Sequence, residues 1–360
     1  MLPPRTASAR SRRREPARWT AALVGAVATV MAGCAGITPP AQSTTQSTAQ
    51  STAQSTARSA PAPGAARSAP PAAEPAMATL ADLARASGAP SALRGVRMIE
   101  ATPSYRRYRM EYGSDGRSAS GTLTLPTGVG PFPAIVSVHG YHPPATYRVG
   151  QGMTREERIF ASRGYVVIHP DLAGYGDSTA ISLLERNLGL AHALDVVNAV
   201  RAVTALDVVD PDRVALVGRS MGGMISLNVL ATHPDLVDGA VLMSPASSLF
   251  EDNLRILHID RSRPFARFVA RRSESQSAAE IYESLSPRSL FDRVRAPVLV
   301  DHGTADAVCP AEWSEQTVTA LREHGVDARL VLYPGEGHVF DASAGAAAEA
   351  AVAFLDEVLG

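Results

Sequence analysis

The sequence predicts an α/β fold in which helices cover both faces of a mostly parallel sheet. The first observation behind this prediction is a series of short, valine-rich apolar runs, the pattern of strands that are buried on both faces. These runs are Ala134 to Val138, Tyr165 to Ile168, Val214 to Val217, Ala240 to Met243, Val298 to Val300 and Arg329 to Leu332. The second observation is that segments with helical periodicity separate the runs, as they do where crossover helices join parallel strands.

Two of the helical segments carry a clear apolar stripe. In the first, the apolar residues at helical spacing are Ala193, Val196, Val197, Val200 and Val203. In the last segment of the chain they are Ala347, Ala351, Phe354, Leu355 and Val358. A single stripe at this spacing predicts a helix that packs one face against the sheet.

Two further segments complete the predicted domain, which is expected to span residues 93–360. Ahead of the first buried run, Tyr105 to Tyr112 and Arg117 to Leu125 flank the turn GSDG, which predicts an antiparallel hairpin. Between Ser247 and Val294, about 50 mostly polar residues show helical stretches and no clear strand. We interpret this segment as a small helical cap inserted between two strands of the sheet.

Length and charge narrow the function classes. The chain has 360 residues, of which 45% are hydrophobic, enough for one large or two ordinary domains. Six arginines and one glutamate lie before Cys34, so the rest of the chain is mildly acidic, with a formal charge of about −6. A mildly acidic body without a basic stripe argues against nucleic-acid binding.

Residues 1–33 predict an export signal. Arginines between Arg10 and Arg18 form a basic region, and Trp19 to Met31 is an apolar run of 13 residues. A membrane-spanning helix needs roughly 20 apolar residues, so this run indicates a signal peptide. It ends in Met31-Ala32-Gly33-Cys34, which resembles the lipobox of bacterial lipoproteins. The resemblance implies acylation of Cys34 and anchoring to the outer face of the bacterial cell membrane; the alternative is an ordinary secretory signal and a secreted product.

Residues 34–92 are expected to form a disordered stalk. Gln42, Gln46, Gln50 and Gln54 mark a four-residue repeat, and Pro- and Ala-rich sequence follows it. Large apolar side chains are nearly absent, so burial cannot offset the entropy that ordering would cost. Cys309 is the only cysteine besides Cys34, so acylation of Cys34 would leave the folded domain without a disulfide.

A serine lies where the third predicted strand ends. Val214 to Val217 run directly into GRSMGG, and a second apolar run follows at once. Gly-x-Ser-x-Gly between a buried strand and a helix is typical of a nucleophile elbow, in which small neighbours permit a sharp turn and expose the hydroxyl of Ser220. The backbone N–H of Met221, at the start of the helix, is expected to face a developing oxyanion.

A serine nucleophile needs a base and an orienting acid. In this fold both follow the serine, in the order acid and then histidine. Asp306 lies in the loop after the buried strand Pro297 to Val300, 86 residues beyond Ser220, and His338 lies 32 residues further on in a glycine-containing loop. Both loops follow the carboxyl ends of strands, at the edge where the elbow lies. We therefore predict a triad of Ser220, Asp306 and His338.

Other titratable residues fit these roles less well. Asp301 lies within a strand and is expected to point into the sheet, while His324 lies near a helix end and is expected to face solvent. We interpret His302 as a hydrogen-bonded structural residue. The histidines at 169, 192, 233 and 258 show no metal-ligand spacing, and no H-E-x-x-H pattern occurs. The sequence therefore predicts no catalytic zinc and no cofactor.

Two loops ahead of the serine are expected to line the same site. His139-Gly140-Tyr141 follows the first buried run, and a backbone N–H from this loop would complete the oxyanion hole. We predict Tyr141 as that donor, with Gly140 as the second choice. The stretch HPDLAGYGDS follows the next strand and is expected to form another wall; we interpret its two aspartates, Asp171 and Asp177, as turn and helix-cap residues.

Four stretches together resemble the prolyl-oligopeptidase-type (S9) serine hydrolases of the α/β-hydrolase superfamily. They are the HG loop, PDLAGYGDS, GRSMGG and SPRSLFDRVRAPVLVDHGTADAVCP, and the resemblance covers roughly Ala134 to Gly360. It implies that Ser220 is the nucleophile, Asp306 the orienting acid and His338 the general base, with the Met221 amide in the oxyanion hole. The chain order and the spacing of the three residues predict the same triad.

The expected activity is acyl transfer to water on a small ester or a short peptide. Peptidases of this family typically carry an N-terminal β-propeller, for which the hairpin and the stalk leave no room, and esterase relatives share the same stretches. A carboxylesterase is therefore favoured over an S9-type peptidase. Two further hypotheses remain: an acyltransferase with the same triad, and a non-catalytic lipoprotein that binds an acyl ligand under its cap.

Overall fold

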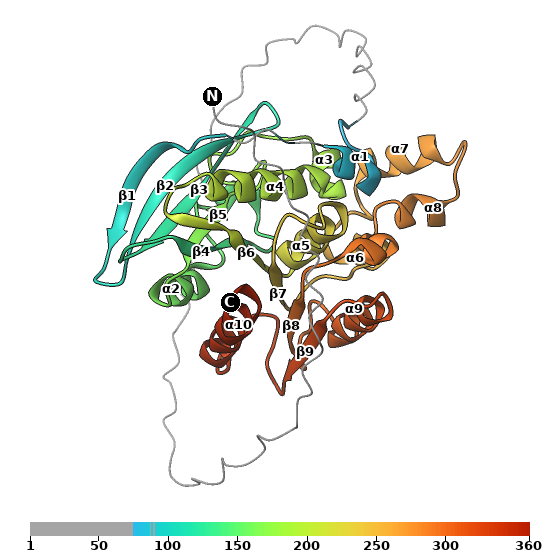
Figure 1. Cartoon of the computed structure of the whole chain (residues 1–360). Coiled ribbons are helices and arrows are strands. Elements are labelled where there is room, and N and C mark those ends of the chain that lie inside the picture. Colours follow the sequence, from blue (N-terminus) through green and yellow to red (C-terminus); the bar gives the residue numbers. More distant parts are fainter. Residues whose placement is uncertain (1–74, 87, 89–90) are drawn as a thin grey trace, which may run out of the picture. The chain divides into compact units, whose positions relative to one another are not determined.

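A nine-stranded sheet forms the centre of the computed structural model, which describes residues 75–86, 88 and 91–360 (Figure 1). The strands follow one another across the sheet in the order β1-β2-β3-β5-β4-β6-β7-β8-β9. Their bounds are β1 Arg94–Ala101, β2 Tyr105–Ser114, β3 Arg117–Pro126, β4 Phe132–Val138, β5 Val166–Pro170, β6 Val209–Arg219, β7 Gly239–Met243, β8 Val298–Gly303 and β9 Ala328–Tyr333. Strands β5, β4, β6, β7, β8 and β9 run parallel, so the predicted α/β class is confirmed.

The antiparallel part of the sheet is built from the predicted hairpin. β2 and β3 pair from Tyr105 opposite Pro126 to Ser114 opposite Arg117. Asp115 and Gly116 form the two-residue turn, and both have positive φ angles, of 50° and 73°. Such a turn requires positive φ at both central residues, which explains the Asp-Gly pair. β3 then pairs antiparallel with β5 and so joins the hairpin to the parallel strands.

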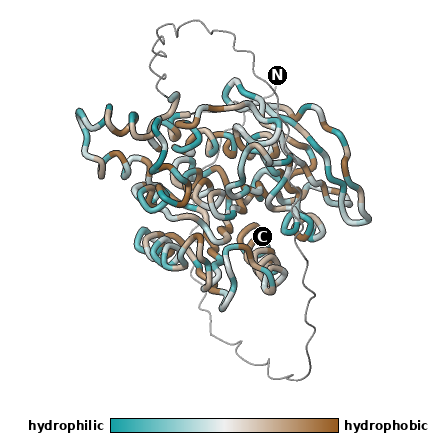
Figure 2. The backbone as a smooth tube through the Cα atoms, turned by 180° about the vertical axis from the view of Figure 1, so that it is seen from behind, coloured by the Kyte–Doolittle hydropathy of each residue, from teal (hydrophilic) through white to brown (hydrophobic). Residues whose placement is uncertain are grey.

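Helices cover both faces of the sheet. On one face α4 (Leu190–Thr204), α5 (Met221–Thr232) and α9 (Ala311–Glu323) pack against the strands. On the other face lie α2 (Thr154–Ser162) and α10 (Ala344–Leu359), as Figure 1 shows. In Figure 2 the hydrophobic stretches of chain lie mainly in the interior, where strands and helices meet. The predicted stripe of α4 is buried, and residues 190–200 of this helix are buried on every side.

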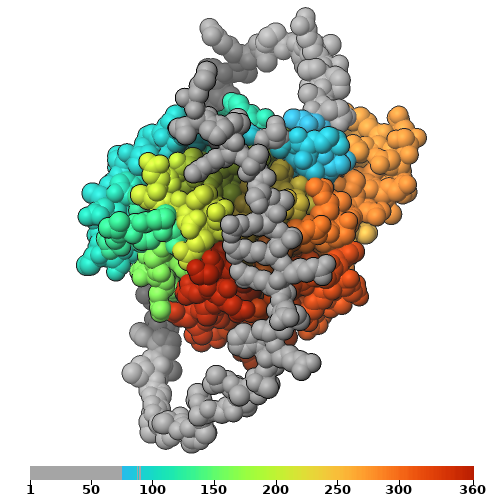
Figure 3. Space-filling model, in the orientation of Figure 1, coloured from blue at the N-terminus to red at the C-terminus, as the bar shows by residue number. Residues whose placement is uncertain are grey.

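The predicted cap is helical, as expected. The chain between β7 and β8 forms α6 (Phe250–Ile256), α7 (Arg263–Arg272), α8 (Ala278–Glu283) and the 3₁₀ segment η2 (Pro287–Arg293). Its buried apolar side chains include Phe250, Phe265, Phe268 and Ile281, which explains how a mostly polar segment holds together. η2 packs against α5, and α7 packs against the short helix α3 (Leu183–Leu188). In Figure 3 α7 and α8, in orange, lie on the opposite side from β1 and β2, in blue-green.

The folded part begins earlier than the predicted boundary at residue 93. A helix, α1 (Leu80–Arg85), precedes it and buries Leu80 and Leu83 in the core beside α4 and α5. The Leu80 N–H also donates a hydrogen bond to the Ser284 carbonyl at the end of α8. The predicted stalk of residues 34–92 therefore includes residues that belong to the folded domain. The export signal of residues 1–33, the lipidation candidate Cys34 and residues 35–74 of the stalk lie outside the described residues.

Within residues 75–86, 88 and 91–360, no helix is both long enough and apolar enough to span a membrane.

Candidate active site

Ser220 occupies a strained turn between β6 and α5. Its backbone angles are φ 56° and ψ −120°, a conformation that non-glycine residues rarely adopt and that characterises the nucleophile elbow. The neighbouring glycines are required by space. A Cβ on Gly222 would lie 2.1 Å from the Val138 carbonyl oxygen, and one on Gly218 would lie 2.4 Å from the Gly222 carbonyl oxygen. The glycines thus let strand and helix approach closely enough to form the turn.

The three residues of the predicted triad lie together. Nε2 of His338 is 2.8 Å from the Ser220 hydroxyl, and Nδ1 of His338 is 2.7 Å from a carboxylate oxygen of Asp306. An ionised carboxylate only accepts hydrogen bonds, so Nδ1 carries a proton and Nε2 is free to accept the serine's proton. The Ser220 side chain is nearly buried and His338 is 19% exposed, which leaves the site open to a substrate.

Asp306 is held as an anion by four donors. One carboxylate oxygen is contacted by the His338 ring and by His302 Nε2, which lies 3.1 Å away. The other oxygen accepts hydrogen bonds from the backbone N–H groups of Val308 and Cys309. Burial alone would raise the pKa of this carboxyl, but the hydrogen bonds from His302, His338 and Cys309 outweigh it and hold the pKa well below its usual range. Asp306 therefore stays charged and can stabilise an imidazolium at His338.

His302 has a more specific role than the sequence indicated. Its side chain is fully buried and hydrogen-bonded, as expected, but one of its partners is the Asp306 carboxylate. Its other nitrogen, Nδ1, lies 2.6 Å from the Ser314 hydroxyl on α9. The Ser314 hydroxyl can donate to Nδ1, which leaves the ring proton on Nε2. This proton is directed at Asp306 and at the Cys309 carbonyl oxygen, which lies 2.9 Å from Nε2.

Cys309 is a residue near the site that sequence reasoning missed. Its side chain is fully buried, and its thiol lies within hydrogen-bonding reach of the Ser220 side chain. Burial and the neighbouring Asp306 charge raise the pKa of this thiol to about 12, so it remains protonated and is a poor nucleophile. In the sequence, only its position three residues after Asp306 indicated that it lies near the site. The thiol packs beside the nucleophile in the interior of the protein.

The competing candidates lie away from the triad's hydrogen bonds. His324 is the exposed C-cap of α9. Asp301 lies in β8, is fully buried and points into the interior of the sheet layer, as the sequence predicted. Neither oxygen of the Asp301 carboxyl has a hydrogen-bond partner among the described residues. Burial raises the pKa of Asp301 to about 7, and the nearby Tyr333 hydroxyl opposes this only partly.

Asp301 predicts a pH dependence of stability. Well below pH 4 the carboxyl is neutral in both the folded and the unfolded chain. As pH rises from about 4 towards 7, only the unfolded chain ionises, so stability falls; above the folded pKa of about 7 the loss levels off. Asp301→Asn removes this loss, so its advantage over the wild type should grow between pH 4.5 and pH 8 by up to about 3 kcal/mol. Urea unfolding at the two pH values measures it; an advantage that does not change with pH would contradict the assignment.

The oxyanion-hole candidates lie beside Ser220. Met221 is the first residue of α5, and the first N–H groups of a helix have no acceptor within it. A Cβ on Gly140 would lie 3.2 Å from the Ser220 Cβ, so the loop after β4 runs directly past the nucleophile. The side chain of Tyr141 is 46% exposed. The structure therefore places both predicted segments at the serine, while the role of the Tyr141 amide remains a prediction.

The stretch from His169 to Ser178 carries a more deeply buried aspartate than expected. Asp171 is fully buried and accepts hydrogen bonds from the Tyr147 hydroxyl, the Gly150 N–H and the Ser120 hydroxyl. It thereby ties the loop after β4 to the loop after β5, which the interpretation as a turn residue did not anticipate. Asp177 instead forms an ion pair with Arg109 at the surface.

No group of three or more His, Cys, Asp or Glu side chains is arranged to hold a metal ion among the residues that the structure describes.

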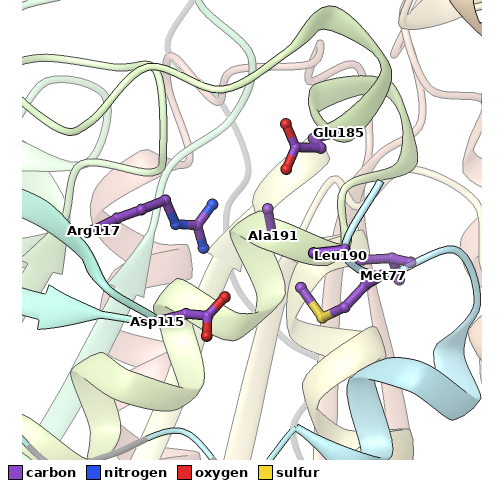
Figure 4. Close-up of a pocket in the computed structure, with 7 residues that line it drawn as sticks. Met77, Asp115, Arg117, Glu185, Leu190 and Ala191 are labelled. Atoms are coloured by element: carbon purple, nitrogen blue, oxygen red, sulfur yellow. The ribbon is translucent and has the colours of Figure 1, made fainter. Parts of the chain in front are cut away.

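A pocket away from the triad lies beside the segment that leads into α1 (Figure 4). Asp115 and Arg117 line it from the β2–β3 hairpin, Glu185 from α3, and Leu190 and Ala191 from α4; Ala76 and Met77 complete the lining. Arg117 lies 3.5 Å from the Asp195 carboxylate, so its charge already has a partner. The pocket is therefore a poor candidate for the catalytic site.

Comparison with known proteins gives a consistent set of relatives. The sequence model of the prolyl oligopeptidase family matches residues 152–360. An acylamino-acid-releasing enzyme of Arabidopsis thaliana is 26% identical over 195 residues, which are 52% of this chain and 25% of that enzyme. Dipeptidyl aminopeptidase BIII of Pseudoxanthomonas mexicana is 27% identical over 262 residues, which are 67% of this chain and 37% of that protein.

A solved structure matches over more of its own length. The acetyl xylan esterase from Paenibacillus sp. R4 superposes with a TM-score of 0.56 and 21% identity, over 78% of this chain and 92% of that chain. At this identity the match shows a shared fold. The two sequence relatives, in contrast, are much longer, and this chain spans only 25% and 37% of their lengths.

Proposed function

Because the chain belongs to the prolyl oligopeptidase family and is a serine hydrolase with the α/β-hydrolase fold, we propose that it hydrolyses small carboxylic esters through an acyl-enzyme. The observation that carries the proposal is the continuous hydrogen-bond chain from the Ser220 hydroxyl through His338 to Asp306. This arrangement activates a serine for attack on a carbonyl carbon.

The proposed reaction has two halves. His338 takes the proton of Ser220 as the oxygen attacks the carbonyl, and the oxyanion that forms is bound by the amides of Met221 and Tyr141. Asp306 stabilises the imidazolium, which then protonates the leaving alcohol. Water, activated by His338 in the same way, releases the acid and restores Ser220. An oxyanion-hole donor contributes roughly 3–4 kcal/mol to such a reaction.

Ester hydrolysis is the reaction that this set of residues supports without further anchors. An alcohol leaves readily, whereas an amine leaves only if His338 protonates its nitrogen, which requires a peptide held in register. The neutral, fully buried thiol of Cys309 beside Ser220 does not compete with the serine as a nucleophile. The architecture is also that of a protein named as an acetyl xylan esterase, along 92% of its length.

A peptidase is the second candidate, because the sequence relatives are named as peptide-cleaving enzymes. One is named for releasing acylamino acids and the other for removing dipeptides. The prolyl oligopeptidase family, to which the chain belongs, is likewise named after a peptidase. Peptide cleavage would use the same triad and oxyanion donors and would need additional contacts to the peptide ends.

One substrate panel distinguishes the two candidates. We expect p-nitrophenyl acetate and butyrate to give the highest kcat/KM, and longer acyl chains to give lower values. Acetyl-alanine p-nitroanilide and Gly-Pro-p-nitroanilide are measured beside them, since they carry the same chromophore on an amide. An anilide cleaved within about tenfold of the best ester would overturn the preference, because amides are intrinsically much harder to cleave.

Export and anchoring form a separate part of the proposal. The apolar run from Trp19 to Met31, followed by Ala32-Gly33-Cys34, supports signal-peptide removal and acylation of that cysteine. Two or more acyl chains are needed for stable attachment to a membrane. We expect the mature protein to begin at a lipid-modified Cys34 and to partition into the detergent phase of Triton X-114, whereas Cys34→Ala partitions into the aqueous phase. Mass spectrometry that finds an unmodified Cys34 in the mature chain would reject this part.

A further inference from the structure

We propose that Arg155 is a positioning residue that fixes the loop of His338 relative to Ser220. The inference rests on the proposed acyl-transfer function and assigns a role to a residue outside the triad and the oxyanion hole. Arg155 lies in the first turn of α2, the helix that packs beside α10 (Figure 1). Its side chain is 47% exposed, so it reaches the active-site loop from the surface of the protein.

The guanidinium of Arg155 donates a hydrogen bond to the loop that carries the catalytic histidine. Its Nη2 lies 3.0 Å from the carbonyl oxygen of Phe340, two residues after His338. The contact joins α2 to the loop between β9 and α10, across 185 positions of the chain. A hydrogen bond from a charged donor is stronger than a neutral one, so this contact resists movement of the loop.

The loop is closed on itself, so that a hold on Phe340 also restrains His338. The carboxylate of Glu336 accepts hydrogen bonds from the backbone N–H groups of Asp341 and Ser343. These bonds tie the two ends of the loop together around the histidine. The Phe340 side chain is buried against α10. Only one residue separates Phe340 from His338, so a shift of the first moves the second.

A buried carboxylate orients the Arg155 side chain. Oε1 of Glu156 lies 3.1 Å from both Nε and Nη2 of Arg155. The Glu156 side chain is only 3% exposed, and a carboxylate at this depth is costly unless cations pair with it. The ion pair therefore holds the guanidinium in the orientation that directs Nη2 at the Phe340 carbonyl oxygen.

The same carboxylate oxygen binds the residue that precedes the nucleophile. Nη2 of Arg219 lies 2.8 Å from Glu156 Oε1, and the Arg219 side chain is 11% exposed. Arg219 is the last residue of β6, so its backbone leads directly into the turn that holds Ser220. Glu156 thus joins two arginines, one beside the nucleophile and one on the loop of the base. This bridge links Ser220 to His338 independently of their direct hydrogen bond.

The distance between Ser220 and His338 affects both halves of the proposed reaction. Nε2 of His338 lies 2.8 Å from the serine hydroxyl and takes a proton first from the serine and later from water. A displacement of about 1 Å in such a group costs roughly 10²-fold in rate. Without Arg155 the loop keeps its internal bonds but loses its link to β6. We therefore expect a smaller loss, of about tenfold.

Two variants remove the contact, and a neighbouring arginine supplies the control. Arg155→Met removes the donors and keeps a long side chain that suits a helix. Arg155→Ala is the second variant. The matched control is Arg158→Met, three residues further along α2. Arg158 is 53% exposed and also forms an ion pair, but with Glu100 of β1 instead of with a residue that contacts the His338 loop.

The readouts are kcat and KM for p-nitrophenyl acetate, the second-order rate of labelling by a fluorophosphonate, and the thermal unfolding midpoint. Both halves of the reaction depend on His338, so kcat should fall about tenfold in the Arg155 variants while KM changes less than twofold. Labelling should slow by a similar factor, because it needs the same base. Arg158→Met should match the wild type in kcat and in labelling. A role in stability alone would lower the midpoint and leave kcat unchanged.

The outcomes are distinguishable. If folded Arg155 variants keep kcat and the labelling rate within about twofold of the wild type, or if Arg158→Met loses as much, the inference is wrong while the proposed function stands. A raised KM at unchanged kcat would also overturn it, because Arg155 would then act in substrate binding. If one Arg155 variant does not fold, the other decides.

The wild type tests the proposed function separately. A wild type that is labelled but does not hydrolyse esters would overturn the ester proposal, and the labelling rates would still test the role of Arg155. A wild type that the probe never labels would overturn the proposed function, and this inference with it.

Discussion

Replacing His338 by alanine is expected to lower kcat on short esters by roughly 10⁴-fold or more, with the fold retained. The side chain links Ser220 to Asp306 at 2.8 and 2.7 Å, so its removal leaves the serine hydroxyl without a base and the leaving group without an acid. Steady-state kinetics with p-nitrophenyl acetate measure the loss, and thermal unfolding shows that the variant is folded.

His324→Ala is the matched control for this substitution. His324 lies 14 residues before His338 and is exposed at the end of α9, so its replacement should change kcat less than twofold. A large loss for His324→Ala together with full activity for His338→Ala would show that the base has been assigned to the wrong histidine.

The second large effect is expected for Asp306→Asn, which should lower kcat by about 10³- to 10⁴-fold. An amide cannot hold the His338 Nδ1–H as the carboxylate does, so the imidazole adopts the wrong tautomer and the imidazolium loses its counter-charge. The fold should survive, because asparagine has the same shape and its oxygen can still accept from the N–H groups of Val308 and Cys309.

Asp301→Asn provides the comparison at a matched position five residues earlier. Its carboxyl is buried in β8 and makes no hydrogen bond to the triad, so kcat should stay within about threefold of the wild type while stability at pH 8 rises. If Asp306→Asn turns over at the wild-type rate and Asp301→Asn does not, the orienting acid is Asp301.

Much of the fold could be predicted because its strands are buried. Val214 to Val217 and Val298 to Val300 read as strands through their apolar runs alone, and both lie in the parallel sheet. The triad residues then follow from chain order, since Asp306 comes after the buried strand β8 and His338 after β9. The prediction that β9 is buried on both faces was wrong, because β9 is the edge strand and of its residues only Ala328 is buried. Because parallel strands place their carboxyl ends at the same edge of the sheet, the loops that carry Asp306 and His338 are expected to lie together at that edge.

The elements that were missed lack this signal. β1 is exposed along almost its whole length, so its sequence shows no alternation, and Val96, Met98 and Ile99 are all about half exposed. α1 has only six residues, of which Leu80 and Leu83 alone are buried. A helix of this length is not stable by itself and forms only against α4 and α5.

The side-chain contacts around the site were likewise invisible in the sequence. The bond from His302 to Asp306 spans four residues but depends on the turn after β8, and the approach of Cys309 to Ser220 joins residues 89 positions apart. The hydrogen bond from His139 to Gly140 joins adjacent residues, yet the ring is oriented by Leu172, His169 and Tyr147 from other parts of the chain. Such contacts are set by tertiary packing.

The central claim is that Ser220 is the activated nucleophile, and covalent labelling tests it most directly. The wild-type protein is treated with a fluorophosphonate, digested and mapped by mass spectrometry. We expect one adduct per chain, on Ser220, and none in a Ser220→Ala variant that unfolds at the same temperature. An adduct on another serine, or equal labelling of Ser220→Ala, would contradict the account.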